Sequence, residues 1–120
     1  MLADFLEKRR HSRFDLRVPL RYRRIQSATQ EFKGSLIKDL SQGGLRIGTF
    51  EFLPINLRLA MEIPLIAGLK SVEGTARVAW VKKSNSSQQY DVGVEFESLN
   101  HGDQQQITKF LYARSEEKPV

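Results

Sequence analysis

The sequence contains no cysteine, and this absence excludes disulfide bonds and thiolate metal sites. A chain without cysteine suits a reducing compartment, so we expect a cytoplasmic protein. The two histidines, His11 and His101, are far apart and have no acidic neighbours at metal-ligand spacing. The sequence also lacks a Ser/His/acid set and a glycine loop that could cradle phosphate. We therefore expect that the protein is not an enzyme.

Long apolar runs are missing as well. The most apolar window, residues 53–69, contains Arg58, Glu62 and two prolines, so it does not predict a membrane span. Asp4 and Glu7 interrupt the first residues before the apolar core of a signal peptide could form. With 120 residues, 40% of them hydrophobic, the chain can form one domain that buries roughly two thirds of its unfolded surface.

The positive charge is concentrated in the first part of the sequence. Residues 1–24 hold eight basic and three acidic side chains, which accounts for the whole net charge of +5. This density is typical of a phosphate-binding segment or of a solvated tail, and charge alone does not decide between them. We expect residues 1–17 to form a flexible basic arm in the unliganded protein, and residues 18–120 to form the folded domain.

Alternation of apolar and polar residues predicts a chain of short strands. The first begins at Val18, with Val18, Leu20 and Tyr22 on one face and arginines on the other. Five further strands are expected at about residues 32–38, 45–47, 57–63, 72–80 and 92–96. Because no helix separates them, they predict an all-β fold, a six-stranded antiparallel barrel whose closure removes exposed sheet edges.

The spacing changes to that of a helix after Leu99. Asn100 is the predicted N-cap, and Asp103 lies in the predicted first turn, where an acidic side chain is favourable. We expect this C-terminal helix to lie against the barrel through one apolar stripe, formed by Ile107, Phe110 and Leu111.

The turn between the second and third predicted strands, residues 39–44, reads Asp-Leu-Ser-Gln-Gly-Gly. Its carboxylate, Asp39, and its hydroxyl, Ser41, can offer hydrogen-bond acceptors next to backbone donors, or they can close a turn on their own backbone. Arg46, in the strand that follows, is predicted to face outward. Two further cations, Arg9 and Arg13, are four residues apart and could grip one compact anion through bidentate forks.

These two stretches resemble the motifs of a known family. Residues 9–13, Arg-Arg-His-Ser-Arg, match the RxxxR motif of the PilZ domain, and residues 39–44 match its DxSxxG motif in the same order. Residues 77–81 and 92–96 with the terminal helix are similar to the second half of such a domain. The resemblance implies a PilZ-like split barrel that binds cyclic di-GMP, a bacterial second messenger, on its outside.

The same resemblance implies roles for individual residues. Arg9 and Arg13 would hold phosphate oxygens and guanine edges. Asp39 would accept from the guanine N1–H and N2–H₂ groups, Ser41 would complete the contact, and Gly44 would leave space for the turn or the base. Further ligand contacts are expected from Lys8, Arg10 and Gly43. Binding would pin the basic arm against the Asp39 turn and signal to an effector protein.

Trp80 has two interpretations. The resemblance places it beside a guanine, where its ring could stack on the base. Its parity, however, matches Val72, Ala76 and Val78, which predicts a core position unless a bulge resets the phase. Phe50 and Phe52 lie in the connection between the third and fourth predicted strands, and we expect them to be core residues or loop anchors and not a binding platform.

Two other functions remain open at this point. One is a PilZ-like interaction module that binds no ligand. The other is a barrel that binds nucleic acid along the basic arm, which predicts an aromatic platform on the exposed face. Most aromatic residues fall on inward phases of the predicted strands, so we do not expect a nucleic-acid partner.

Overall fold

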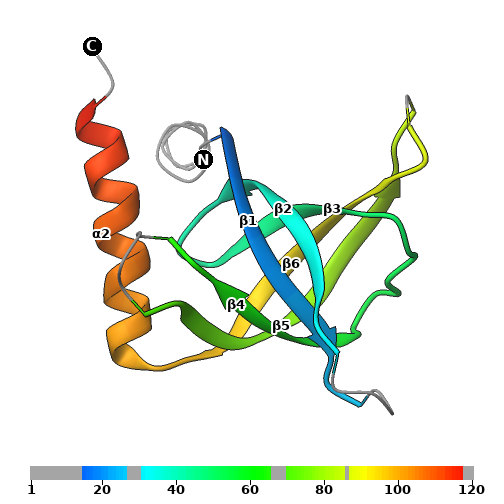
Figure 1. Ribbon diagram of the computed structural model, residues 1–120, viewed down its shortest axis with the longest axis horizontal. Coiled ribbons are helices and arrows are strands. Elements are labelled where there is room, and N and C mark those ends of the chain that lie inside the picture. The colour runs from blue at the N-terminus through cyan, green and yellow to red at the C-terminus, as the bar shows by residue number, and fades with distance from the viewer. Residues whose placement is uncertain (1–14, 27–30, 66–69, 86, 118–120) are drawn as a thin grey trace, which may run out of the picture.

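The computed structural model describes residues 15–26, 31–65, 70–85 and 87–117 (Figure 1). Six antiparallel strands form a closed barrel in the order β1-β2-β3-β6-β5-β4, and one helix follows them. The elements are β1 (Asp15–Arg24), β2 (Lys33–Leu40), β3 (Gly44–Thr49), β4 (Arg58–Ile63), β5 (Val72–Lys83), β6 (Tyr90–Leu99) and α2 (His101–Glu117). The predicted all-β barrel with a C-terminal helix is therefore confirmed.

The strand β1 closes the barrel because it pairs with β2 on one side and with β4 on the other. It begins three residues before the predicted start at Val18. Leu20 and Tyr22 point into the core and are 1% and 3% exposed, whereas Arg21 between them is exposed. This alternation is the one that the sequence predicted, since each strand has one apolar and one solvated face.

The core fills the inside of the barrel with aliphatic side chains from all six strands and from the helix. Its fully buried members of largest volume are Leu20, Ile37, Leu40, Ile47, Leu53, Leu59, Ile63, Val72, Val78, Val92 and Ile107. Thr49 is the buried polar residue in the described part of the chain, and its hydroxyl donates to the Glu51 carbonyl at 2.8 Å. The filled interior leaves the outer wall as the place for a polar ligand.

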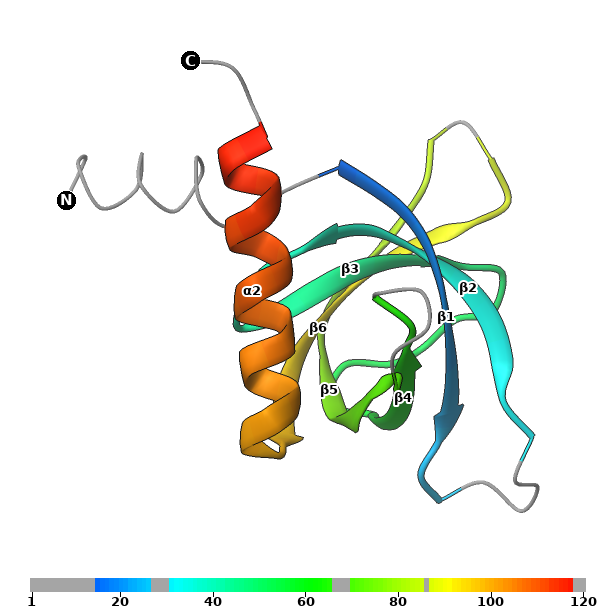
Figure 2. The same ribbon diagram turned by 60° about the vertical axis from the view of Figure 1, so that its left-hand side comes forward.

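The helix α2 stands beside one end of the barrel (Figure 2). Its N-cap is Asn100, as predicted, since the side-chain Oδ1 accepts from the Asp103 N–H at 2.7 Å. The Asp103 carboxylate in turn accepts from the Glu73 N–H at 3.1 Å, which ties the first turn of α2 to β5. Ile107 and Leu111, four residues apart, are the buried side chains of its apolar stripe. In the part of the chain that is described, no helix combines the length and the apolarity needed to cross a membrane.

Bulges change which residues face outward. The register between β5 and β6 shifts between Val78 and Trp80, so Ala79 is an extra residue on β5. Trp80 is consequently 40% exposed, and the core position predicted from its parity is wrong. Phe50 and Phe52 were expected to be core residues or loop anchors, and of these two alternatives the core position is wrong, because the side chains are 75% and 52% exposed.

Candidate functional site

The β2–β3 turn is closed by Ser41. The Ser41 N–H donates to the Gly44 carbonyl at 2.8 Å, and its hydroxyl donates to the same oxygen at 3.2 Å. The hydroxyl also accepts from the Gly43 N–H at 3.3 Å. Ser41 therefore satisfies the backbone of its own turn, which was one of the two interpretations of this residue.

Close packing of two strands requires a glycine at position 44. A Cβ atom at this position would overlap the backbone carbonyl of Val94 on the neighbouring strand β6, so the two strands could not approach as they do. One residue earlier, the Gly43 carbonyl accepts from the Phe96 N–H at 2.9 Å, whereas a Cβ at Gly43 would meet no atom within 4 Å. The last two residues of the motif thus dock the turn onto β6.

Asp39 lies on the outer wall and is paired with a cation from the next strand. Its Oδ2 accepts from Nε of Arg46 at 2.8 Å, and the two residues are direct cross-strand partners. The side chains of Asp39 and Arg46 are 13% and 28% exposed, which makes this ion pair more shielded from solvent than a typical surface pair. Arg46 was predicted to face outward, but its place beside Asp39 was not predicted.

The ion pair extends into a short chain of charges. NH1 of Arg46 lies 3.7 Å from Oδ2 of Asp91 on β6, and the Asp91 Oδ1 accepts from Nζ of Lys38 at 2.6 Å. Lys38 is the extra residue of a bulge in β2, between Ile37 and Asp39. The bulge explains why two consecutive residues, Lys38 and Asp39, both reach partners on the outer wall.

A row of three side chains, Asp39, Arg46 and Trp80, crosses four strands at one level of the barrel. The backbone register pairs Asp39 with Arg46, Arg46 with Gly93, and Gly93 with Trp80. The Trp80 indole lies over Gly93, because a Cβ built there would overlap its ring nitrogen Nε1. The outer wall therefore presents a carboxylate, a guanidinium and an aromatic ring in one line, which we call the outer row (Asp39, Arg46 and Trp80).

The chemistry of the outer row suits a purine nucleotide. A guanidinium can bind a phosphate or the O6 and N7 acceptors of guanine, and a carboxylate can accept from the guanine N1–H and N2–H₂ groups. An exposed indole can stack on a base. No group of three or more acidic or histidine side chains lies close enough to hold a metal ion among the residues described.

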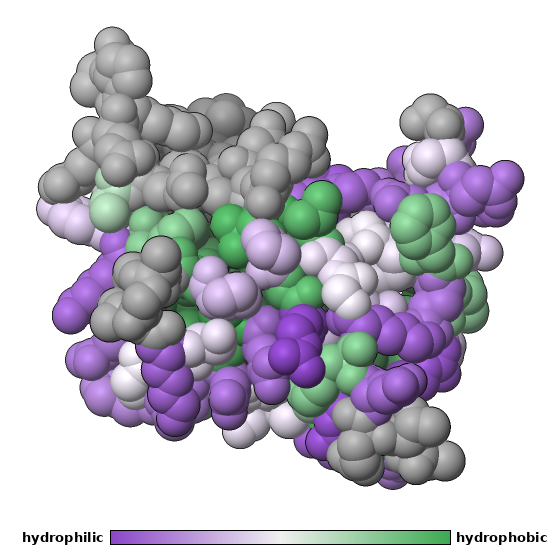
Figure 3. All heavy atoms as spheres, in the orientation of Figure 1, coloured by the Kyte–Doolittle hydropathy of each residue, from purple (hydrophilic) through white to green (hydrophobic). Residues whose placement is uncertain are grey.

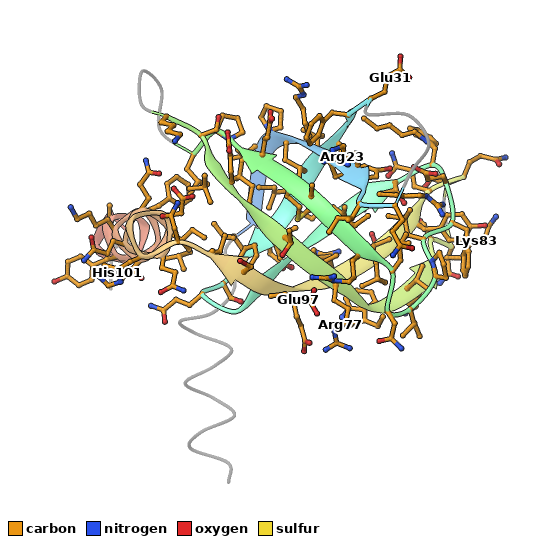
Figure 4. The ribbon with its side chains drawn as sticks, turned by 90° about the horizontal axis from the view of Figure 1, so that it is seen from below. Arg23, Glu31, Arg77, Lys83, Glu97 and His101 are labelled. Carbon is orange, nitrogen blue, oxygen red and sulfur yellow. The ribbon has the colours of Figure 1, made fainter. Side chains whose placement is uncertain are left out.

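A second set of charges lies on the outer wall at β4, β5 and β6. Arg77 donates to Glu95 at 2.6 Å and lies 3.8 Å from Glu97, which accepts from Arg58 at 2.8 Å. Arg77 and Glu97 lie side by side on the surface (Figure 4). These pairs form a charge network of their own on the outer wall, outside the outer row.

A small hollow separates the β2–β3 turn from the helix. Its volume is about 250 Å³, and it is lined by Gln42 and Gly43 of the turn, by residues 96–99, and by Gln104, Ile107 and Thr108 of α2. The turn that carries the predicted motif is thus at the end of the barrel where α2 stands.

The predicted site residues fall into two groups. The structure brings Asp39, Ser41, Gly43 and Gly44 together in one turn, and it places Trp80 on the same wall through the outer row. The basic residues Lys8, Arg9, Arg10 and Arg13 lie outside the described residues. Two residues of the wall were not assigned to the site from the sequence, Arg46 and Gly93. A glycine inside a strand signals close approach of another group, so Gly93 carried a readable signal.

The fold and its outer row define a small antiparallel barrel with its candidate site on the outer wall. The sequence profile of the PilZ domain matches residues 7–113, and the chain belongs to the PilZ domain family. Comparison with curated proteins gives no significant match.

Solved structures with the same fold have low sequence identity to this chain. The PilZ domain of YcgR from Escherichia coli with c-di-GMP has a TM-score of 0.60 and 14% identity, covering 88% of this chain and 91% of that chain. Bacillus subtilis MotI/DgrA, an inhibitor of motility, has a TM-score of 0.75 and 20% identity, covering 90% and 51%. The MrkH–c-di-GMP complex of K. pneumonia has a TM-score of 0.65 and 21% identity, covering 88% and 51%. The chain thus spans about half the length of MotI/DgrA and MrkH.

Proposed function

We propose that the protein is a receptor for cyclic di-GMP, and that the ligand bridges the RxxxR segment and the outer row. In this proposal Arg9, Arg10 and Arg13 bind phosphates and guanine edges from one side, and Asp39 with its turn binds a guanine from the other. Membership of the PilZ family supports it, as do the complexes of MrkH and YcgR with c-di-GMP. A bacterial source, a cytoplasmic location and an effector protein as partner belong to the same proposal.

One observation carries the proposal. The Cα of Asp15, the first residue of β1, is the register partner of Asp39. Arg13 precedes Asp15 by two residues, and two residues span at most roughly 7 Å. The strand β1 therefore begins beside Asp39, and Arg13 is at most roughly 7 Å along the chain from that point.

The outer row gives each part of the ligand a partner. Arg46 adds a guanidinium between the carboxylate of Asp39 and the ring of Trp80, so one base can stack while a neighbouring phosphate is neutralised. Gly43 leaves open space at the turn, through which a base edge can approach. Ser41 contributes by holding the turn that aims Asp39.

Signalling would follow from ordering of the arm. Charge-assisted hydrogen bonds contribute roughly 1.5–3 kcal/mol each, whereas ordering one residue costs roughly 1–2 kcal/mol. Three or four such bonds offset the ordering of about ten residues only together with base stacking, which contributes roughly 1–3 kcal/mol per base. The ordered arm and the ligand-covered wall would then form the surface that an effector protein binds.

Isothermal titration with cyclic di-GMP at two salt concentrations tests the proposal. The wild type should bind cyclic di-GMP, and the affinity should be lower at the higher salt concentration. The reason is that salt screens the attraction between the basic arm and the phosphates of the ligand. Arg13→Ala and Asp39→Ala should each reduce the affinity at least tenfold. Lys109→Ala on α2 removes an exposed cation as Arg13→Ala does, and it should leave binding unchanged.

Absence of heat with the wild type would reject the proposal. Because an exposed Trp80 also suits a barrel that binds nucleic acid, the same titration is run with single-stranded oligonucleotides. Binding of these in preference to cyclic di-GMP would favour that second function.

A further inference from the structure

A groove opens in the outer wall at the end of the β2–β3 hairpin away from the DxSxxG turn. Its volume is about 580 Å³, and we call it the β2 groove. Its lining comes from the start of β2, the end of β3 and the connection that follows, and consists of Tyr22, Lys33–Leu36, Lys38, Gly48–Glu51 and Gln89. None of these residues belongs to the outer row.

The wall of the groove is bare at Gly34, which lacks a side chain and has open space above it. Gly48, the register partner of Leu36, is covered by the side chains of Lys38 and Gln89, each 3.0 Å from the position of an added Cβ. The ladder between β2 and β3 ends at this pair, whereas β2 continues through residues 33–35 against β1 alone. Residues 33–35 therefore have a strand partner in β1 but none in β3, although the Ser35 hydroxyl donates to the Gly48 carbonyl. An extended chain could pair with their main chain on the side away from β1.

Apolar side chains border the groove and remain in contact with solvent. Leu36 and Phe50 line it and are 45% and 75% exposed, and Phe52 and Ile55 on the same β3–β4 connection are 52% and 57% exposed. Apolar side chains reach the surface at this end of the barrel among hydrophilic ones (Figure 3). Single exposed apolar residues are ordinary, but four on adjacent segments indicate an interaction surface.

The charge around the groove is positive. Two acids of the region are already paired, since Glu51 accepts from Lys33 at 2.9 Å and from Tyr22 at 2.8 Å, and Asp91 accepts from Lys38 at 2.6 Å. The groove and the adjoining strand ends carry five cations, Arg24, Lys33, Lys38, Lys82 and Lys83, against these two acids. Arg24, Lys33 and Lys38 are the partners of the two acids. The Lys83 side chain lies on the outside at this end of the barrel (Figure 4). A partner that meets this rim should carry acidic residues.

We propose that the β2 groove docks an extended segment of a partner protein in which an apolar side chain is flanked by acidic ones. The unpaired stretch of β2 provides main-chain hydrogen bonds, the space beside Phe50 and Leu36 takes the apolar side chain, and the cationic rim takes the acids. A volume of about 580 Å³ lies within the range of pockets that take a ligand-sized group, so it suits one apolar side chain with its flanking main chain. The docking does not require cyclic di-GMP, so it stands apart from the proposed receptor function.

Selection of peptides from a displayed library of random twelve-residue sequences tests the docking. The purified chain is the bait, and the Leu36→Ser/Phe50→Ser double variant is used for counter-selection. We expect enriched peptides with an apolar residue within two positions of Asp or Glu. A fluorescein-labelled synthetic copy should bind the wild type, and bind Phe50→Ser at least tenfold more weakly. Tyr112→Ser removes an exposed aromatic ring from α2 and should bind like the wild type.

Three results would overturn the proposal. They are no enrichment over the double variant, enriched peptides without acidic residues, and equal affinity for the wild type and Phe50→Ser. Melting curves of the variants check that they fold, which their exposed positions favour. Sedimentation of the free chain tests whether a second copy of the chain occupies the groove. A dimer that Phe50→Ser dissociates would assign the groove to that second copy and would reject the peptide.

Discussion

The indole of Trp80 lies over the α-carbon of Gly93, its cross-strand partner, and fills the space that a side chain would take there. The bulge at Ala79 turns the ring outward, and the missing side chain at residue 93, the register partner of Arg46, leaves room for the ring. A ring held in this way is a ready surface for a base. The bulge at Ala79 and the glycine at position 93 are therefore the two features that place an exposed aromatic ring on the outer wall.

Gly93→Ala should displace the indole and weaken cyclic di-GMP binding about tenfold, since stacking on an aromatic ring contributes roughly 1–3 kcal/mol per base. Trp80 is the single tryptophan of the chain, so its emission reports on this ring alone. Titration and fluorescence are compared with those of Gly102→Ala, in which the added Cβ makes an ordinary contact at the start of α2. Unchanged emission and affinity in Gly93→Ala would contradict the stacking role.

Arg46→Gln should reduce the affinity for cyclic di-GMP by about ten- to a hundredfold. The substitution removes a charge-assisted bond worth roughly 1.5–3 kcal/mol, and it also removes the donor that positions Asp39 at 2.8 Å. The dependence of binding on salt should fall as well. Arg58→Gln is the matched control, because this exposed arginine pairs with Glu97 at 2.8 Å outside the outer row. If both variants bind alike, Arg46 has no part in ligand binding.

Gly44→Ala should destabilise the fold by roughly 1–3 kcal/mol, because its methyl group would press on the Val94 carbonyl of a neighbouring strand. Urea unfolding measures the loss. Gly43→Ala, with open space at the added atom, should change the free energy of unfolding by less than about 0.5 kcal/mol. A stable Gly44→Ala variant that no longer binds cyclic di-GMP would show instead that this glycine makes room for the ligand.

Acid should weaken the anchor of the β3–β4 connection at Glu51. Burial raises the pKa of this carboxyl, but hydrogen bonds from Lys33 and Tyr22 and the charges of Lys33 and Arg24 outweigh it, so the net shift of the pKa is downward. A lowered folded pKa gives stability that is complete above the unfolded value of 4.5 and is lost as the pH falls through the folded value. The difference in melting temperature between wild type and Glu51→Gln should therefore shrink below about pH 4.5.

Glu62→Gln serves as the control for this pH dependence. Its carboxylate pairs at 3.5 Å with Arg21, whose side chain is exposed, and no further ion pair of Glu62 is found among the described residues, so the substitution should have little effect at any pH. A difference between wild type and Glu51→Gln that stays constant from pH 7 to pH 3 would contradict the assignment.

The sequence predicted the strands and the helix because their signals are local. The alternation in β1 and the N-cap at Asn100 each follow from a few neighbouring residues, and both are confirmed. The DxSxxG turn was located for the same reason, since its glycines and its serine define it.

The positions that were wrong depend on register, which a pattern along one strand does not contain. The parity of Trp80 favoured a core position over a stacking position, because the extra residue Ala79 is visible only in the pairing with β6. Arg46 looked like an ordinary solvated residue, and its neighbour Trp80 is separated from it by 34 positions in the sequence. Phe50 and Phe52 lie on a connection, where apolar character does not distinguish a core anchor from an interaction surface.

The double pairing of β1 has a mechanical consequence. This strand is the seam of the cylinder, and its leading end lies at Asp39 while its far end is joined to Leu59–Glu62 of β4. A ligand that binds the chain just before Asp15 would stabilise the pairing of β1 with both of its neighbours. Deuterium uptake should therefore slow in β4, a strand that contributes no residue to the outer row.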